Sequence, residues 1–252
     1  MRAEYRTRGL VAILPPQANT TVEAELGVLL EPDIGAVVSR LTCFESDART
    51  RLLGYFHNVG AAVRALDTAT PAFGLFACTG STYLVGLPEE DRAFAALPLP
   101  LVSAARAVLQ SLEALNARKI ALVSPYPAWL TEACVAFWRA QGKDVLSVRT
   151  PEGDRSDTRR IYDLGSAQAL NEITALSTVK ADCILVTGTG MPSLPAIARA
   201  RIGTPVLSSN LCLAWAAHRK LGSDTPLERW LAPDAPWRGR LAARFPKAME
   251  IQ

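Results

Sequence analysis

Short apolar runs alternate along the chain with longer segments in which apolar residues recur at helical spacing. The runs are four to six residues long and rich in Val, Ile, Leu and Ala. Such runs are typical of strands that are buried on both faces of a parallel sheet. They predict strands at residues 9–14, 36–41, 73–77, 99–102, 119–123, 145–148, 183–187 and 205–210. Strands and helices that alternate in this way predict an α/β fold with parallel sheets.

The segments between the apolar runs predict the connecting helices. They are expected at residues 46–66, 88–96, 104–116, 130–141, 167–179, 191–200 and 211–221. One more helix is expected to begin after the first strand, with Asn19 or Thr20 as its N-cap and Glu23 in the capping-box position. The tail after residue 222 contains several prolines, Trp230 and Trp237, and we expect it to pack on the body of the protein or on a second subunit.

An internal repeat relates the two parts of the chain. A shift of 110 positions lays residues 73–81 on 183–191 and residues 11–16 on 121–126. A period of this length indicates two half-domains. We assign residues 1–96 together with 211–252 to the N-terminal half, and residues 97–210 to the C-terminal half.

The most informative turn follows the predicted strand at residues 73–77. Ligands of open α/β sheets bind at the carboxyl ends of the strands, and at this end Cys78 is followed by Thr79, Gly80 and Ser81. We therefore expect Cys78 at the active site, where N–H groups of the turn favour its thiolate form. The shift of 110 positions lays Cys78 on Gly188. The opposite wall is expected to come from the turns of the second half, at Gly188, Thr189, Gly190, Ser208 and Ser209.

Residues 150–165 form the longest polar segment of the chain. A loop of this length in a compact domain is usually functional. We weigh two interpretations equally, a lid over the active site and a plain surface loop.

Composition and charge exclude several classes of protein. The chain has 252 residues, 49% of them hydrophobic, and a net charge of +3 with acids and bases interspersed, so a nucleic-acid-binding protein is not expected. We find neither a signal peptide nor an apolar stretch long enough to cross a membrane, and we expect a cytoplasmic protein. Five cysteines without a C-x-x-C pair indicate reduced thiols. His57 and His218 are far from any ligand spacing, so no metal site is expected.

Several segments, in this order, resemble the maleate cis-trans isomerases. They are Pro15-Pro-Gln-Ala-Asn-Thr-Thr-Val-Glu23, the Cys78 turn, Ser124-Pro-Tyr126, Met191-Pro-Ser-Leu194, and Ser208-Ser-Asn210 with Trp215. These enzymes and the arylmalonate decarboxylases form one branch of the aspartate/glutamate racemase superfamily. The resemblance implies two Rossmann-like halves related by pseudo-two-fold symmetry, with a cofactor-free active site in the cleft between them. By position, Asn19, Cys78, Thr79 and Tyr126 match the isomerase pattern, with Cys78 as the nucleophile.

Two departures from the isomerase pattern concern the reaction. Isomerases carry a second cysteine where this chain has Gly188, and an asparagine expected within residues 150–165 has no counterpart. Arylmalonate decarboxylases show the opposite asymmetry, with glycine at the first position and the thiol at the second. Racemisation by proton removal on one face and delivery on the other requires two acid/base groups, so a two-thiol racemase is disfavoured.

We therefore expect a cysteine-dependent isomerase of a small dicarboxylate such as maleate, which works through a thiolate adduct and an enediolate. Tyr126 or a bound water is the candidate proton donor, and no cofactor is needed. The alternatives are an arylmalonate-type decarboxylase with Cys78 as proton donor, a racemase-like enzyme, and a non-catalytic carboxylate-binding relative in which Cys78 is a buried hydrophobe. A small carboxylate or dicarboxylate is the expected partner, with neither nucleic acid nor membrane, and a homo-oligomer is possible.

Overall fold

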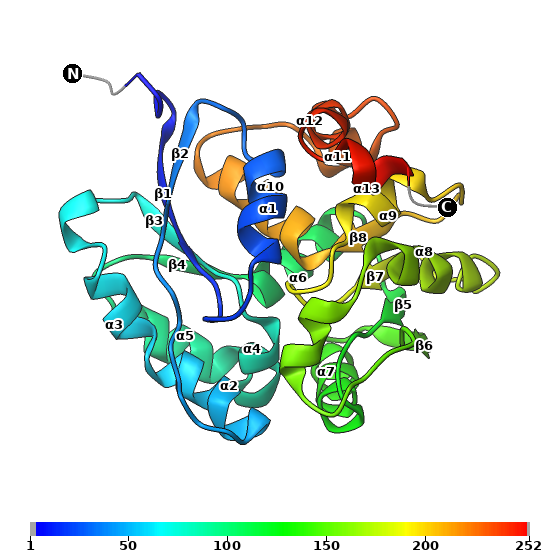
Figure 1. The fold of residues 1–252 in the computed structure, drawn as a ribbon, viewed down its shortest axis with the longest axis horizontal. Helices are drawn as coiled ribbons and strands as arrows, with labels where there is room; N and C mark the ends of the chain where they lie inside the picture. Colours follow the sequence, from blue (N-terminus) through cyan, green and yellow to red (C-terminus); the bar gives the residue numbers. More distant parts are fainter. Residues whose placement is uncertain (1–3, 251–252) are drawn as a thin grey trace.

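Two parallel sheets of four strands form the framework of the protein. The computed structural model describes residues 4–250 (Figure 1). The first sheet has the order β2-β1-β3-β4 and the second the order β6-β5-β7-β8. The strands are β1 (Gly9–Leu14), β2 (Ile34–Val38), β3 (Phe73–Phe76), β4 (Leu101–Ser103), β5 (Lys119–Val123), β6 (Asp144–Arg149), β7 (Cys183–Val186) and β8 (Val206–Ser208). The predicted α/β fold with two parallel sheets is confirmed.

The helices lie around the sheets and connect their strands (Figure 1). They are α1 (Thr21–Leu29), α2 (Ala48–His57), α3 (Val59–Arg64), α4 (Thr79–Val85), α5 (Leu87–Ala95), α6 (Ala104–Ala114), α7 (Ala128–Ala140), α8 (Ser166–Ala175), α9 (Leu194–Arg199), α10 (Ser209–Lys220), α11 (Leu227–Leu231), α12 (Pro236–Arg244) and α13 (Pro246–Glu250), with the 3₁₀ helices η1 (Asp67–Ala69) and η2 (Thr158–Asp163). None of the helices between residues 4 and 250 is long and apolar enough to span a membrane.

The internal repeat is visible in the order of the strands. β1 and β5 begin 110 residues apart, at Gly9 and Lys119, and so do β3 and β7, at Phe73 and Cys183. The last pair, β4 and β8, begins 105 residues apart, at Leu101 and Val206. The connection between the third and fourth strands is therefore five residues shorter in the second sheet, where α9 stands in place of α4 and α5.

The first sheet extends beyond the boundary that we expected near residue 97. β4 pairs with β3 in parallel, with Gly74 opposite Leu101 and Phe76 opposite Ser103, although we assigned residues 97–210 to the second half. The apolar residues of β4 complete the edge of the first sheet, because the crossover through α4 and α5 returns the chain to the strand beside β3.

Several local predictions need correction. The single helix expected at residues 46–66 is two helices, α2 and α3, that meet at Asn58, whose side chain donates to the Thr42 carbonyl (2.8 Å). The prediction of a capping box at the start of α1 is also wrong. The Asn19 side chain accepts from the N–H groups of Thr21 (3.0 Å) and Val22 (3.2 Å), while Glu23 pairs with Arg40 and does not cap the helix.

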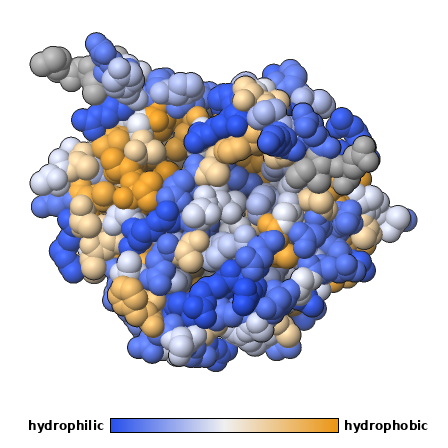
Figure 2. Space-filling model, in the orientation of Figure 1, coloured by the Kyte–Doolittle hydropathy of each residue, from blue (hydrophilic) through white to orange (hydrophobic). Residues whose placement is uncertain are grey.

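The C-terminal tail packs on the body of the protein. Trp230 and Trp237 are 8% and 2% exposed, and α12 contacts both α1 and α9. The Arg240 side chain donates to the Val28 carbonyl at the end of α1 (2.7 Å). Apolar side chains gather in one area of the surface, over the region of β1 and β3, and hydrophilic side chains cover most of the rest of this face (Figure 2).

Candidate active site

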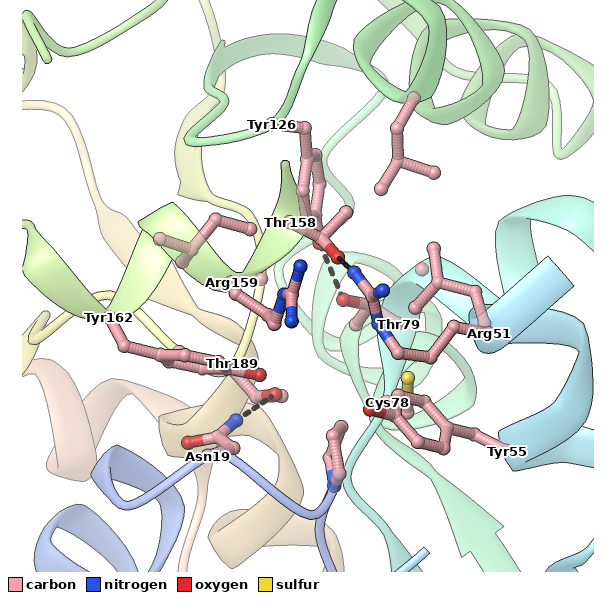
Figure 3. A pocket seen from close by; sticks show the side chains of 17 residues that line it. Asn19, Arg51, Tyr55, Cys78, Thr79, Tyr126, Thr158, Arg159, Tyr162 and Thr189 are labelled. Carbon is pink, nitrogen blue, oxygen red and sulfur yellow. Dashed lines mark hydrogen bonds between the residues drawn. The ribbon is translucent and has the colours of Figure 1, made fainter. Parts of the chain in front are cut away.

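One pocket lies at the carboxyl ends of β1, β3, β5 and β7, where both halves of the repeat meet (Figure 3). Its volume is about 40 Å³. The side chains and turns around it are Pro16, Asn19, Arg51, Leu52, Tyr55, Cys78, Thr79, Gly80, Tyr126, Leu130, Thr158, Arg159, Ile161, Tyr162, Gly188, Thr189 and Gly190.

Cys78 is the only cysteine among these residues. It lies between β3 and α4 and is 3% exposed. Its Sγ is 3.1 Å from the Ser81 hydroxyl, which donates to the Leu52 carbonyl (2.7 Å) and so can accept the S–H hydrogen. Burial raises the pKa of the Cys78 thiol, and the N–H groups of Gly80 and Ser81 oppose this effect only in part. The turn alone was expected to favour the thiolate, whereas desolvation by the whole pocket favours the neutral thiol.

Two hydroxyl-centred pairs face the pocket, one on each side of the pseudo-symmetric site. Thr79 and Tyr126 share a hydrogen bond of 2.6 Å. Asn19 Nδ2 donates to the Thr189 hydroxyl (3.0 Å), which in turn donates to the Ala77 carbonyl (2.8 Å). Thr79 and Thr189 are equivalent under the 110-residue shift, and each is bonded to a residue of the other half (Figure 3). The repeat therefore brings four neutral polar groups to one cavity.

Burial holds the pKa of the Tyr126 phenol well above its ordinary value. The phenol consequently remains protonated at neutral pH. A protonated phenol in a buried site can donate a hydrogen bond to an oxyanion, which gains more from such a bond than a neutral oxygen does.

Gly188 has a backbone conformation that disfavours any residue with a side chain. Its φ angle is +84°, and a Cβ atom there would lie 3.2 Å from both Pro125 Cγ and the Tyr126 hydroxyl. The phenol of Tyr126 thus lies close to where the first atom of a side chain at position 188 would be. With glycine at position 188, Cys78 is the one thiol in the lining of the pocket.

The segment of residues 150–165 contributes one wall of the pocket. Its 3₁₀ helix η2 places Thr158, Arg159, Ile161 and Tyr162 along the cavity. The segment is tied to α2 by Arg51, a 3% exposed side chain whose Nη2 is 2.5 Å from the Asp157 carboxylate. Burial raises the pKa of Tyr162 above its ordinary range. The segment is therefore part of the pocket, and its role as a lid stays a prediction.

Comparison with known proteins gives the family. The arylmalonate decarboxylase family profile matches residues 78–229, more than half of the chain. The chain belongs to the arylmalonate decarboxylase family. The chain is also 29% identical over 231 residues to the maleate isomerase of Nocardia farcinica (strain IFM 10152), with 84% of this chain and 89% of that protein covered.

Solved structures of a maleate isomerase and of arylmalonate decarboxylase share the fold. A serine variant of the Nocardia farcinica maleate cis-trans isomerase, with a covalently bound succinylcysteine intermediate, superposes with a TM-score of 0.72 at 25% identity, covering 84% of this chain and 92% of that chain. A crystal structure of arylmalonate decarboxylase superposes with a TM-score of 0.70 at 24% identity, covering 86% of this chain and 93% of that chain.

Most of the site residues expected from the sequence lie together in this family member. Of the residues predicted for the site, those that line the pocket are Asn19, Cys78, Thr79, Gly80, Tyr126, Gly188, Thr189 and Gly190. Ser81, Ser208 and Ser209 do not line it. Ser81 lies behind Cys78, and the Ser208 hydroxyl accepts from the Leu211 N–H (3.3 Å) at the start of α10. Ser209 is fully buried beside it.

Sequence reasoning missed the residues that α2 contributes. Arg51, Leu52 and Tyr55 line the pocket from this helix. Arg51 and Tyr55 are four positions apart and therefore share a face with each other, which also carries the buried Leu52. An arginine on the apolar face of a predicted helix was the available signal, because a buried guanidinium needs a partner.

Proposed function

We propose that this protein is a cofactor-independent, cysteine-dependent isomerase that converts a small cis-enedioate such as maleate to its trans isomer, with Cys78 as the nucleophile. The observation that carries the proposal is a single thiol in a pocket whose remaining polar groups are hydroxyls, an amide and two arginines. The similarity of this chain to the maleate isomerase of Nocardia farcinica supports the reaction. The succinylcysteine intermediate in the solved structure of that relative supports a covalent cysteine adduct.

The reaction begins with the loss of the Cys78 proton to solvent. The sulfur then donates an electron pair to one alkene carbon, and the π electrons move onto the neighbouring carbon and its carboxylate to form an enediolate. The former double bond is now single and rotates. When the electron pair re-forms the double bond, the C–S bond breaks and the thiolate leaves as it came.

The neutral polar pairs favour the enediolate over the bound substrate. More negative charge lies on the carboxylate oxygens in the enediolate than in the substrate, so hydrogen bonds to those oxygens strengthen along the reaction. Thr79 with Tyr126, and Asn19 with Thr189, are the groups that we assign to this role, together with the N–H groups of the turns at Gly80, Gly188 and Gly190. Tyr126 is also the assigned proton donor if the enediolate is transiently protonated.

The second candidate is decarboxylation with Cys78 as proton donor. The raised pKa of the Cys78 thiol favours it, because a neutral thiol is an acid and a weak nucleophile. Carbon dioxide would leave a malonate with its electron pair retained in the enediolate, and the thiol proton would pass to the α-carbon.

Proton NMR with maleate and, separately, with a prochiral arylmalonate tests the two candidates. We expect fumarate from maleate, and a loss of at least about a thousandfold in turnover in Cys78→Ala, because the nucleophile itself is removed. Cys43→Ala is the matched control, since Cys43 is buried but does not line the pocket. Carbon dioxide release without any fumarate would replace the first candidate by the second. If neither fumarate nor carbon dioxide forms, the result favours a non-catalytic carboxylate-binding protein.

We also propose a cytoplasmic location. All five cysteines are unpaired and buried. Unpaired thiols are usual in reducing compartments, where a reactive cysteine also survives as a thiol.

A further inference from the structure

Arg159 is the one charged residue of η2 that lines the pocket. Figure 3 shows its side chain extending from η2 into the space between the Asn19–Thr189 pair and the Thr79–Tyr126 pair. The side chain is 61% exposed, so its guanidinium lies at the mouth of the cavity, where an entering ligand meets it first.

A carboxylate already occupies one edge of this guanidinium. Arg159 Nε and Nη2 lie 3.2 Å from the two oxygens of Asp157, which is the paired geometry that guanidinium groups form with carboxylates. The third nitrogen, Nη1, forms no hydrogen bond with any residue between 4 and 250. Arg159 therefore has donors that a second carboxylate can use, either beside Asp157 or in its place.

Arg51, the other arginine of the pocket, is not available in the same way. Its Nη1 donates to the carbonyls of Glu45 (3.1 Å) and Ser46 (2.9 Å), and its Nη2 contacts Asp157 and Thr158. The side chain is 3% exposed. Arg51 holds the lid against α2, whereas Arg159 remains free to bind a ligand.

The charge of the pocket leaves one cation for a substrate carboxylate. The residues that line it include two arginines and no acidic residue, and Asp157, just outside it, pairs with both arginines and offsets one of the two positive charges. The neutral hydroxyl and amide groups suit one carboxylate, but a second carboxylate that is taken from water into a closed site needs a cation. Arg159 is the cation at the mouth, on the side that the lid covers.

We propose that Arg159 is the specificity-determining residue for the second carboxylate of the substrate. This inference rests on the proposed function in that it concerns the same site. One carboxylate binds to the neutral groups beside Cys78, and the other binds Arg159 on η2, at the mouth of the pocket. The enzyme thereby accepts short dicarboxylates and discriminates against monocarboxylates of the same length.

Calorimetric binding of two unreactive ligands tests the inference without requiring turnover. Succinate has two carboxylates, and butyrate has the same number of carbons with one. We expect the wild-type protein to bind succinate more tightly, and Arg159→Gln to weaken succinate binding by about 10- to 100-fold, the loss of one charge-assisted pair. Butyrate binding should change by less than about threefold, and Arg159→Lys should recover part of the succinate affinity.

Arg160→Gln is the matched control from the same segment. Arg160 pairs with Asp154 and Asp163 and does not line the pocket, so its loss should leave both affinities unchanged. Undiminished succinate binding in Arg159→Gln would overturn the inference, as would a wild-type protein that does not distinguish the two ligands. If Arg159→Gln selectively loses succinate binding but the wild type does not isomerise maleate, the inference stands and the proposed function is wrong.

Discussion

At the scale of single residues, Gly188 decides how many thiols the pocket contains. Its φ of +84° lies in the left-handed region, and the space around its Cα is taken by Pro125 and Tyr126. We predict that Gly188→Ala destabilises the protein by about 1–2 kcal/mol through backbone strain alone. The new methyl group should also displace the Tyr126 hydroxyl and weaken succinate binding. Chemical denaturation and calorimetry measure the two effects.

Gly222→Ala separates strain from displacement. Gly222 has a φ of +82° and no atom within 4 Å of the position of a Cβ, and it lies outside the pocket. The same loss of stability with unchanged succinate binding is expected there. If Gly188→Ala binds succinate as well as Gly222→Ala does, the contact with Tyr126 has no part in ligand binding.

At the scale of elements, α1 holds the turn at residues 188–190, which forms the wall of the pocket opposite Cys78. Glu25 on this helix is 5% exposed and accepts from the N–H groups of Ser193 and Leu194 (2.8 Å for Leu194) and from Asn210 Nδ2 (2.7 Å). Asn210 Nδ2 also donates to the Thr189 carbonyl (3.1 Å). One buried carboxylate from the first half therefore fixes the position of Thr189 in the second.

The ionisation of Glu25 predicts a pH dependence of stability. Burial raises its pKa from the ordinary value of 4.5, so the folded protein favours the protonated form. The stability that this group contributes is complete below 4.5 and is lost as the pH rises through its folded pKa. We predict that Glu25→Gln, which cannot ionise, is less stable than wild type at low pH and that the difference narrows as the pH rises.

Urea denaturation of the wild type and of Glu25→Gln, from below pH 4.5 upward, measures the difference in the free energy of unfolding. Glu113→Gln on the exposed side of α6 is the control, and it should change the free energy of unfolding by less than about 0.5 kcal/mol. A difference that stays constant with pH would contradict the assignment of a raised pKa to Glu25.

At the scale of the whole molecule, His218 joins the C-terminal tail to the body. Its ring packs edge-on against Trp230 with a centroid distance of 4.7 Å, and its Nδ1 is 2.9 Å from the Ala214 carbonyl. The charged groups around it are Glu31, 3.9 Å from Nε2, with Arg8 and Arg240 nearby. Burial lowers the pKa of His218 below its ordinary value of 6.5.

Acidification is therefore expected to loosen the tail. A histidine with a lowered folded pKa contributes stability that is present above 6.5 and is lost as the pH falls through the folded pKa. We predict that the thermal midpoint of the wild type falls when the pH is lowered below 6.5, and that the midpoint of His218→Phe falls less. His57→Phe, at an exposed position on α2, is the control. Equal acid sensitivity in wild type and His218→Phe would show that the tail is held independently of this ring.

Much of the fold could be predicted because local pattern and strand burial agree. The predicted bounds of β1 (Gly9–Leu14) and β5 (Lys119–Val123) match the structure. Strands that are covered on both faces must be apolar at consecutive positions, and this requirement is visible without any tertiary contact. The bounds of the helices were less certain, and the break at Asn58 depends on a bond to Thr42, which is distant in sequence.

The sequence by itself determined the α/β order, the repeat, and the place of Cys78, Asn19 and Thr79 at strand ends. These follow from hydrophobic period and from the rule that parallel strands present their carboxyl ends together. The tertiary structure alone decided that Arg51 and Arg159 line the pocket and that burial raises the pKa of the Cys78 thiol. The direction of a side chain and its desolvation depend on every neighbour in space, and those neighbours come from both halves of the chain.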